Sequence, residues 1–195
     1  MNAPNARAPE RPAAASFCLI ERLRNGRAVE IRAFRPGDRA GLMVAVGSRS
    51  SGQSLRSRFF TVRRHFSQRE IDSFMNVDFV GHVALVAVVE EASGPAIIGA
   101  GRYIVGRAGS AELALAVIDE YQGLGIGTAL VRSLIAIARA AGLETLVAHV
   151  LSENAAMLNI FKSCGLPLEM HGDREVMHLT LALKARAAVQ MPAVH

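Results

Sequence analysis

Several features that would assign the chain to a special class of protein are scarce in its 195 residues. It has no tryptophan and only two cysteines, Cys18 and Cys164, which are too few and too far apart for a disulfide framework or a cysteine metal cluster. No apolar run reaches the roughly 18 residues that a membrane span requires. The alanine- and proline-rich start of the chain lacks the apolar core of a signal peptide. These absences predict a cytoplasmic protein with reduced thiols and no membrane partner.

The composition that remains is that of one globular domain. Apolar residues make up 51% of the chain and charged residues 20%, and the length suffices for one full hydrophobic core. We expect a disordered leader over residues 1–16, a single folded domain over residues 17–184 and a flexible tail over residues 185–195.

The positive charge is unevenly spread. The net charge is +5, and Lys162 and Lys184 are the only lysines, so the excess comes almost entirely from arginine. Residues 56–69 contain arginines at 56, 58, 63, 64 and 69 and no acid. This segment is either a solvated face or a surface that meets an acidic partner or the phosphates of a nucleotide. Nucleic acid is not an expected partner, because no nucleic-acid-binding motif is present.

The most informative stretch is a strand-like segment at residues 112–118, a glycine-rich turn, and a helix that starts at Thr128 and stops at Gly142. The turn reads Gln-Gly-Leu-Gly-Ile-Gly over residues 122–127. Its three glycines allow the backbone N–H groups to approach a ligand closely. At a helix N-terminus, unpaired N–H groups and the helix dipole favour negative charge. The turn therefore predicts a phosphate or pyrophosphate site.

Two better-known glycine motifs do not fit this turn. A dinucleotide fingerprint requires the spacing G-x-G-x-x-G, and a P-loop requires a lysine after its last glycine. Neither is present here. The alternative to a phosphate site is a tight strand-to-helix turn that binds no ligand.

The other segments predict strands and helices around the turn. Alternating and β-branched runs predict strands at residues 29–34, 82–89, 97–105, 145–151 and 176–183. Helical spacing predicts helices at residues 38–46, 67–76 and 154–163, the second opened by a capping box of Ser67 and Glu70. The alternation of strand and helix indicates an α/β, or mixed α+β, fold with parallel strands beside the glycine turn.

Two motifs together resemble the GNAT superfamily of acyl-CoA-dependent N-acetyltransferases. The turn at residues 122–127 is similar to the pyrophosphate loop of that superfamily. The segment at residues 154–166, with Asn154, Met157, Phe161 and Gly165, is similar to its second characteristic segment. The resemblance covers roughly residues 29–183. It implies a GNAT fold, with a central mixed sheet of about six or seven strands flanked by about four helices.

The resemblance also implies acetyl-CoA as co-substrate and no metal. It places the pyrophosphate on the turn, whose residues are Gln122, Gly123, Leu124, Gly125, Ile126, Gly127 and Thr128. The pantetheine arm would lie along Leu115, Ala116 and Val117, where a backbone N–H could polarise the thioester carbonyl. Asn154 would lie near the pantetheine, and its position before a helix also fits an N-cap.

Transfer to an amine needs a general base, and the sequence offers two candidates. Glu112 matches the glutamate of an A-E-x-A pattern in Pat-like proteins, and it shares a strand face with the small residues Ala114 and Ala116. His149, on the following strand, is the alternative. Each also has a structural interpretation, as a solvated carboxylate at a strand start and as a packed histidine in an apolar strand.

Phe161 departs from the pattern of the family, which often has at this position a tyrosine that protonates the leaving thiolate. A phenyl ring can pack on CoA but cannot donate a proton. The only phenols are Tyr103 and Tyr121, and the sequence assigns neither to this role. Because a thiol has a pKa near 8.5, the thiolate could leave without a dedicated acid or take a proton from water.

Residues 54–87 resemble the N-terminal part of the acetyltransferase domain of bacterial Pat-type protein lysine acetyltransferases. Such enzymes acetylate an active-site lysine of acyl-CoA synthetases and related proteins. We therefore expect acetyl transfer to a protein lysine, by a monomer or homodimer. Two alternatives stay open: a small-molecule amine as acceptor, and a non-catalytic regulatory module that binds acyl-CoA.

Overall fold

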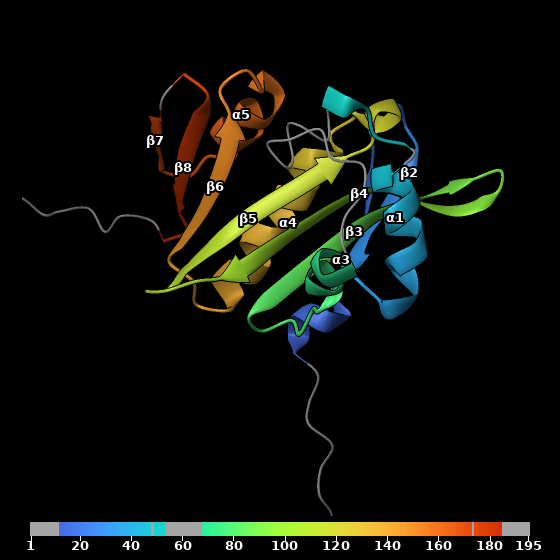
Figure 1. Ribbon diagram of the computed structural model, residues 1–195, viewed down its shortest axis with the longest axis horizontal. Helices are drawn as coiled ribbons and strands as arrows, with labels where there is room; N and C mark the ends of the chain where they lie inside the picture. Colours follow the sequence, from blue (N-terminus) through green and yellow to red (C-terminus); the bar gives the residue numbers. More distant parts are fainter. Residues whose placement is uncertain (1–11, 48, 54–67, 173, 185–195) are drawn as a thin grey trace, which may run out of the picture.

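The computed structural model describes residues 12–47, 49–53, 68–172 and 174–184, which form one eight-stranded sheet with helices on both faces (Figure 1). The strands are β1 (Cys18–Arg22), β2 (Ala28–Ala33), β3 (His82–Glu91), β4 (Gly94–Val105), β5 (Ser110–Val117), β6 (Thr145–Leu151), β7 (Leu168–Gly172) and β8 (Val176–Ala182). The helices are α1 (Arg39–Gly47), α3 (Gln68–Met75), α4 (Ile126–Ala140) and α5 (Ala155–Lys162). Short 3-10 helices are η1 (Ala13–Ser16), η2 (Pro36–Asp38) and η3 (Asp119–Tyr121).

The strand order is β1-β2-β3-β4-β5-β6-β8-β7. Every neighbouring pair is antiparallel except β5 and β6, which are parallel because α4 carries the chain from one to the other. In Figure 1, α4 lies behind β4 and β5, whereas α1 and α3 lie in front. The predicted parallel pair beside the glycine turn is thus confirmed.

The core lies mainly between the sheet and α4. Leu130 and Leu134 of α4 are fully buried against Gly101 of β4, where an added Cβ would lie 3.0 Å from Leu134 Cδ1. On β5 the odd-numbered residues, such as Leu115 opposite Gly101, face this core. The period of two therefore turns the even-numbered residues of β5 to the opposite face, toward α1 and α3.

The predicted fold class and the four helices are confirmed, and each predicted strand is present within a few residues. The sheet has eight strands where six or seven were expected, since β1 and β7 were not predicted. Both are five-residue edge strands with no fully buried residue: β1 shows no alternation, and β7 alternates over only residues 168–171, which is too short to mark a strand clearly. Residues 13–16, at the end of the expected leader, form η1.

Some predictions fall on residues outside the described ranges. The capping residue Ser67 and all the arginines of the basic segment before Arg69 are among them. Arg69 itself is exposed on α3. Within the described residues, no helix is both long and apolar enough to cross a membrane.

Candidate functional site

Strands β5 and β6 are paired over only the first part of their length. The last residues in register are Glu112 of β5 and Val147 of β6. Beyond them both strands continue but diverge, and the sheet opens into a wedge between β5 and β6 (Figure 1). Glu112 therefore lies at the apex of the wedge, and in the described chain no strand pairs with this edge of β5 beyond it. Alternate backbone N–H and C=O groups at that edge are left for a ligand.

A cavity of about 670 Å³ lies at the open end of this wedge. Its volume falls in the range of roughly 300–1,000 Å³ that is typical of ligand sites. We call it the wedge cavity. It is lined by all the residues predicted to bind the cofactor except Leu124 and Phe161, namely Leu115, Ala116, Val117, Gln122, Gly123, Gly125, Ile126, Gly127, Thr128 and Asn154.

The glycine turn has the geometry of an anion site. Gly123 and Gly125 adopt positive φ values of 75° and 99°, and an added Cβ on either would meet no atom within 4 Å. Gly125 is the N-cap of α4 and has no side chain to accept a hydrogen bond. Because the first backbone bond of the helix runs from Ala129 N to Gly125 O, the N–H groups of residues 126–128 precede it along the cavity wall. This end of α4 fits a pyrophosphate group of CoA.

Arg24 was not predicted from the sequence, yet it joins the glycine turn. It lies in the turn between β1 and β2, and its Nη1 donates to Gly123 O at 3.2 Å. Its backbone N donates to Leu124 O at 3.2 Å. No sequence signal links residues that are 99 positions apart. The exposed guanidinium adds a positive charge where the anion would bind.

The two candidate bases, which the sequence offered as alternatives, lie together. Glu112 Oε1 is 3.8 Å from His149 Nδ1, and His149 lies two residues beyond Val147, the last residue of β6 that pairs with β5. The side chains are 61% and 40% exposed, so both are open to solvent and to a substrate. His149 also contacts His178 of β8 edge-on, with ring centroids 4.7 Å apart.

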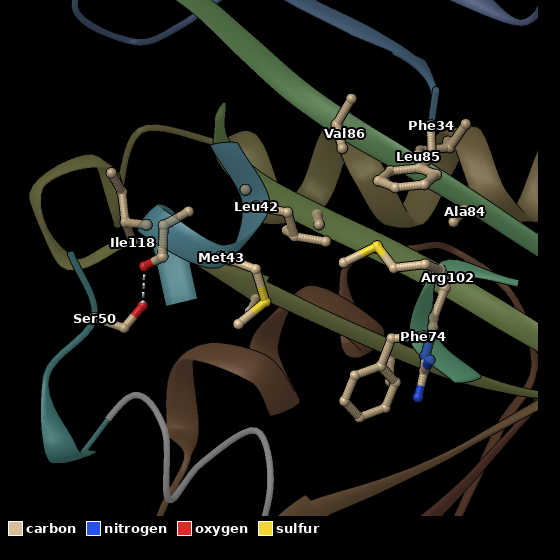
Figure 2. Close-up of a pocket in the computed structure, with 17 residues that line it drawn as sticks. Phe34, Leu42, Met43, Ser50, Phe74, Ala84, Leu85, Val86, Arg102 and Ile118 are labelled. Carbon is tan, nitrogen blue, oxygen red and sulfur yellow. Dashed lines mark hydrogen bonds between the residues drawn. The ribbon is translucent and has the colours of Figure 1, made fainter. Parts of the chain in front are cut away.

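A second cavity, of about 100 Å³, lies on the other face of the sheet, under α1 and α3 (Figure 2). We call it the apolar pocket, since among the residues that the structure describes only Ser50 and Arg102 line it with polar side chains. Its floor includes Ala114 and Ala116, which lie on the same face of β5 as Glu112. Because Ala116 and Ser50 line both cavities, the apolar pocket and the wedge cavity are adjacent.

Neither phenol is placed to protonate a thiolate. Tyr103 is 1% exposed in the core, where burial raises the pKa of its hydroxyl. Tyr121 lines the wedge cavity, but its hydroxyl donates to Glu91 Oε1 at 2.9 Å and accepts from Arg27 Nη1 at 3.0 Å. The tyrosine absent at Phe161 is therefore not replaced by another phenol in the described chain.

Phe161 and Leu124 lie outside the lining of the wedge cavity. Phe161 is 1% exposed and packs in the hydrophobic core, and Leu124 packs partly buried against that core. Asn154 lines the cavity and also caps α5, since its Oδ1 accepts from Met157 N at 3.1 Å. The two interpretations of Asn154 are geometrically compatible. Within the described residues no group of three His, Cys, Asp or Glu side chains could hold a metal ion.

Comparison with known proteins agrees with this geometry. The chain is similar to the acetyltransferase PA5475 of Pseudomonas aeruginosa, with 31% identity over 147 residues that cover 75% of this chain and 78% of that protein. It is also similar to the acetyltransferase Pat of Mycolicibacterium smegmatis, with 34% identity over 144 residues, which are 73% of this chain and 42% of that longer protein.

Among solved structures, the GNAT domain of S. lividans PAT superposes with a TM-score of 0.76 and 28% identity, over 89% of this chain and 99% of that domain. The sequence of residues 53–166 matches the family model of the acetyltransferase (GNAT) family. The chain therefore belongs to the GNAT acetyltransferase family and is an acyl-CoA-dependent N-acetyltransferase.

Proposed function

We propose that this acetyltransferase transfers the acetyl group of acetyl-CoA to a lysine side chain of a protein, with Glu112 as the general base. One observation carries the proposal: Glu112 lies at the apex of the wedge and on the same face of β5 as Ala114 and Ala116, which line the apolar pocket, and Ala116 also lines the wedge cavity. A donor held in the wedge cavity and an acceptor entering through the apolar pocket would meet at Ala116, on the strand face that leads past Ala114 to this carboxylate.

In the proposed reaction the lysine ammonium gives one proton to Glu112, and the neutral amine nitrogen attacks the thioester carbonyl carbon. A C–N bond forms, the C–S bond breaks and the nitrogen loses its second proton to water, so that an amide and the CoA thiolate result. The thiolate takes its proton from water, because no phenol of the described chain reaches it. A positioned general base is worth about 10²–10⁴ in rate, so most of the effect of Glu112 is expected in kcat.

The apolar pocket supports a protein lysine as acceptor. Its volume of about 100 Å³ is below the range of roughly 300–1,000 Å³ for sites that enclose a whole small molecule. The methylene stem of one lysine side chain suits a lining of alanine, leucine, methionine and phenylalanine. The similarity to proteins named Pat points to the same class.

A small-molecule amine is the second candidate acceptor. Polyamines and other cationic amines are best held by an enclosed pocket with several carboxylates. No acidic side chain lines the apolar pocket in the described chain, and its one charged residue, Arg102, has the wrong sign for a polycation.

The test follows release of CoA thiol from acetyl-CoA, with an acyl-CoA synthetase and a panel of small amines as acceptors. We expect release with the synthetase and its loss in Glu112→Gln, and we expect Glu169→Gln to behave as wild type, because that exposed glutamate lies on edge strand β7. Release with small amines alone would exclude the protein acceptor. Tight CoA binding without release from any acceptor would favour the regulatory module.

A further inference from the structure

Arg102 is a charged side chain in an apolar setting. The proposed reaction assigns no role to it. It lies on β4, lines the apolar pocket and is half-buried there. Burial lowers the pKa of its guanidinium, and the negative charge of Glu112 only partly opposes this effect. Within the described chain no carboxylate or carbonyl oxygen makes an ion pair or hydrogen bond with it. A half-buried cation without an anionic partner is costly, so a reason for keeping it must be sought.

The surroundings of Arg102 leave space for such a partner. Its neighbours in register are Ala84 on β3 and Ala114 on β5, the smallest side chains that a strand can present besides glycine. The guanidinium carbon lies 4.4 Å from the centre of the Phe74 ring, and Figure 2 shows the two side chains next to each other. Stacking on Phe74 occupies one face of the planar group and leaves its N–H edge free to bind a carboxylate with two hydrogen bonds.

The position of Arg102 relative to the proposed base is defined by the register. Glu112 pairs with Ile104, two residues after Arg102, so both charged groups are on the same face of adjacent strands. Ala114 lies directly opposite Arg102, and it is the next residue after Glu112 on the same face of β5. An acceptor resting on Ala114 would therefore have a carboxylate on one side and a guanidinium on the other. A cationic amine beside Glu112 and an anionic group beside Arg102 would match both charges.

We propose that Arg102 binds a carboxylate of the acceptor, so that the enzyme prefers a lysine flanked by an acidic residue. The inference rests on the proposed function for the identity of the reacting amine, but the charge preference is a separate property. The competing explanation is that the Arg102 stem only covers apolar surface while its head is solvated. In that case a change of charge at position 102 would leave acceptor selectivity unaltered.

The test uses pairs of peptides that contain one lysine and differ only in having Glu or Gln at both flanking positions. With wild type we expect kcat/KM for CoA release to be roughly tenfold higher for the Glu peptide, mainly through KM, since a charged hydrogen-bonded pair at a half-buried site contributes about that much. Arg102→Gln should remove the difference, and Arg102→Lys, which keeps the charge but loses the planar fork, should retain part of it. Arg132→Gln removes an exposed charge from α4, outside the residues that line the two cavities, and should leave the preference unchanged.

Two further arms separate this inference from the proposed function. Anisotropy of the same labelled peptides, measured with CoA present, reports the Glu-over-Gln preference even if no peptide is acetylated. Free amino acids and their amides test the other source of a carboxylate: acetylation of the acids alone, dependent on Arg102, would keep the role of Arg102 and overturn the protein acceptor. No charge preference in wild type, or the same preference in Arg102→Gln, would overturn the inference.

Discussion

Glu112 Oε1 and His149 Nδ1 lie 3.8 Å apart across the point where β5 and β6 separate. With side chains 61% and 40% exposed, this pair contributes at most about 1 kcal/mol to stability. We therefore expect the pair to matter for the proposed reaction and not for stability. The parallel pairing brings a carboxylate and an imidazole from two strands to the apex of the wedge, where a proton taken by the first can pass to the second or to solvent.

If Glu112 is the base and His149 only assists it, substitution of Glu112 should lower kcat more than substitution of His149. We expect Glu112→Gln to lower kcat by about 10²–10⁴, and His149→Gln to lower it by less than about tenfold. The double variant should be no slower than Glu112→Gln, because groups that act as one unit are not additive. Steady-state kinetics with saturating acetyl-CoA measure this. A larger loss in His149→Gln than in Glu112→Gln would make the histidine the base.

The two ends of α4 offer a matched pair of glycines. Gly125 at its N-terminus and Gly142 after its C-terminus have φ values of 99° and 77°, and an added Cβ on either would meet nothing within 4 Å. Alanine at either position should therefore cost a similar free energy of unfolding, about 1–2 kcal/mol, through backbone strain alone.

Only the Gly125→Ala variant should weaken binding of acetyl-CoA, because Gly125 lines the wedge cavity and Gly142 does not. We expect KM for acetyl-CoA to rise about tenfold in Gly125→Ala and to stay within twofold in Gly142→Ala. Urea denaturation with steady-state kinetics on both variants provides the check. Equal changes in KM would mean that the turn acts through stability and not through contact with the ligand.

The sequence predicts elements whose pattern is local and misses contacts that depend on long-range pairing. The glycine turn is predicted from its three glycines, and α4 from apolar residues that recur at helical spacing and so form one face to be buried. The short edge strand β1 has no such period, because no residue in it is fully buried. Arg24 meets Gly123 only because the turn between β1 and β2 reaches the start of α4, and Arg102 enters the apolar pocket only through the register of β3, β4 and β5.

Arg24 should contribute to the affinity for the CoA pyrophosphate and not to the chemical step. Its guanidinium lies at the glycine turn, bonded to Gly123 O at 3.2 Å, and is exposed to solvent. We expect Arg24→Gln to raise KM for acetyl-CoA roughly three- to tenfold with little change in kcat, and the effect to shrink as salt is added. Arg22→Gln is the control, since Arg22 bonds Gly26 O in the same hairpin and does not line the cavity. A fall in kcat for Arg24→Gln would contradict this role.

The start of α1, which covers the apolar pocket, is held by a buried ion pair. Arg32 Nη1 and Nη2 donate to the two Asp38 carboxylate oxygens at 2.7 and 2.8 Å, and Arg35 N donates to Oδ2 at 2.7 Å. Burial alone would raise the pKa of Asp38, but these hydrogen bonds and the nearby charges outweigh it, and the pKa is lowered. Asp38→Asn removes the two-point carboxylate partner of the buried Arg32 and leaves only Glu30, at 3.5 Å, as its anion in the described chain, so it should cost at most about 3–5 kcal/mol at pH 7.

The sign of the pH dependence follows from that lowered pKa. A carboxyl whose pKa is lower in the folded state adds stability above its unfolded pKa, near 3.9, and loses it as the pH falls through the folded value. The difference between wild type and Asp38→Asn should therefore be largest near pH 7 and should shrink below about pH 4. Urea denaturation at several pH values measures it. Asp72→Asn is the control, because the 3.0 Å pair of Asp72 with Arg39 is exposed and its loss should cost less than about 1 kcal/mol. A difference that stays constant from pH 7 to pH 3 would show that Asp38 acts through packing and not through its charge.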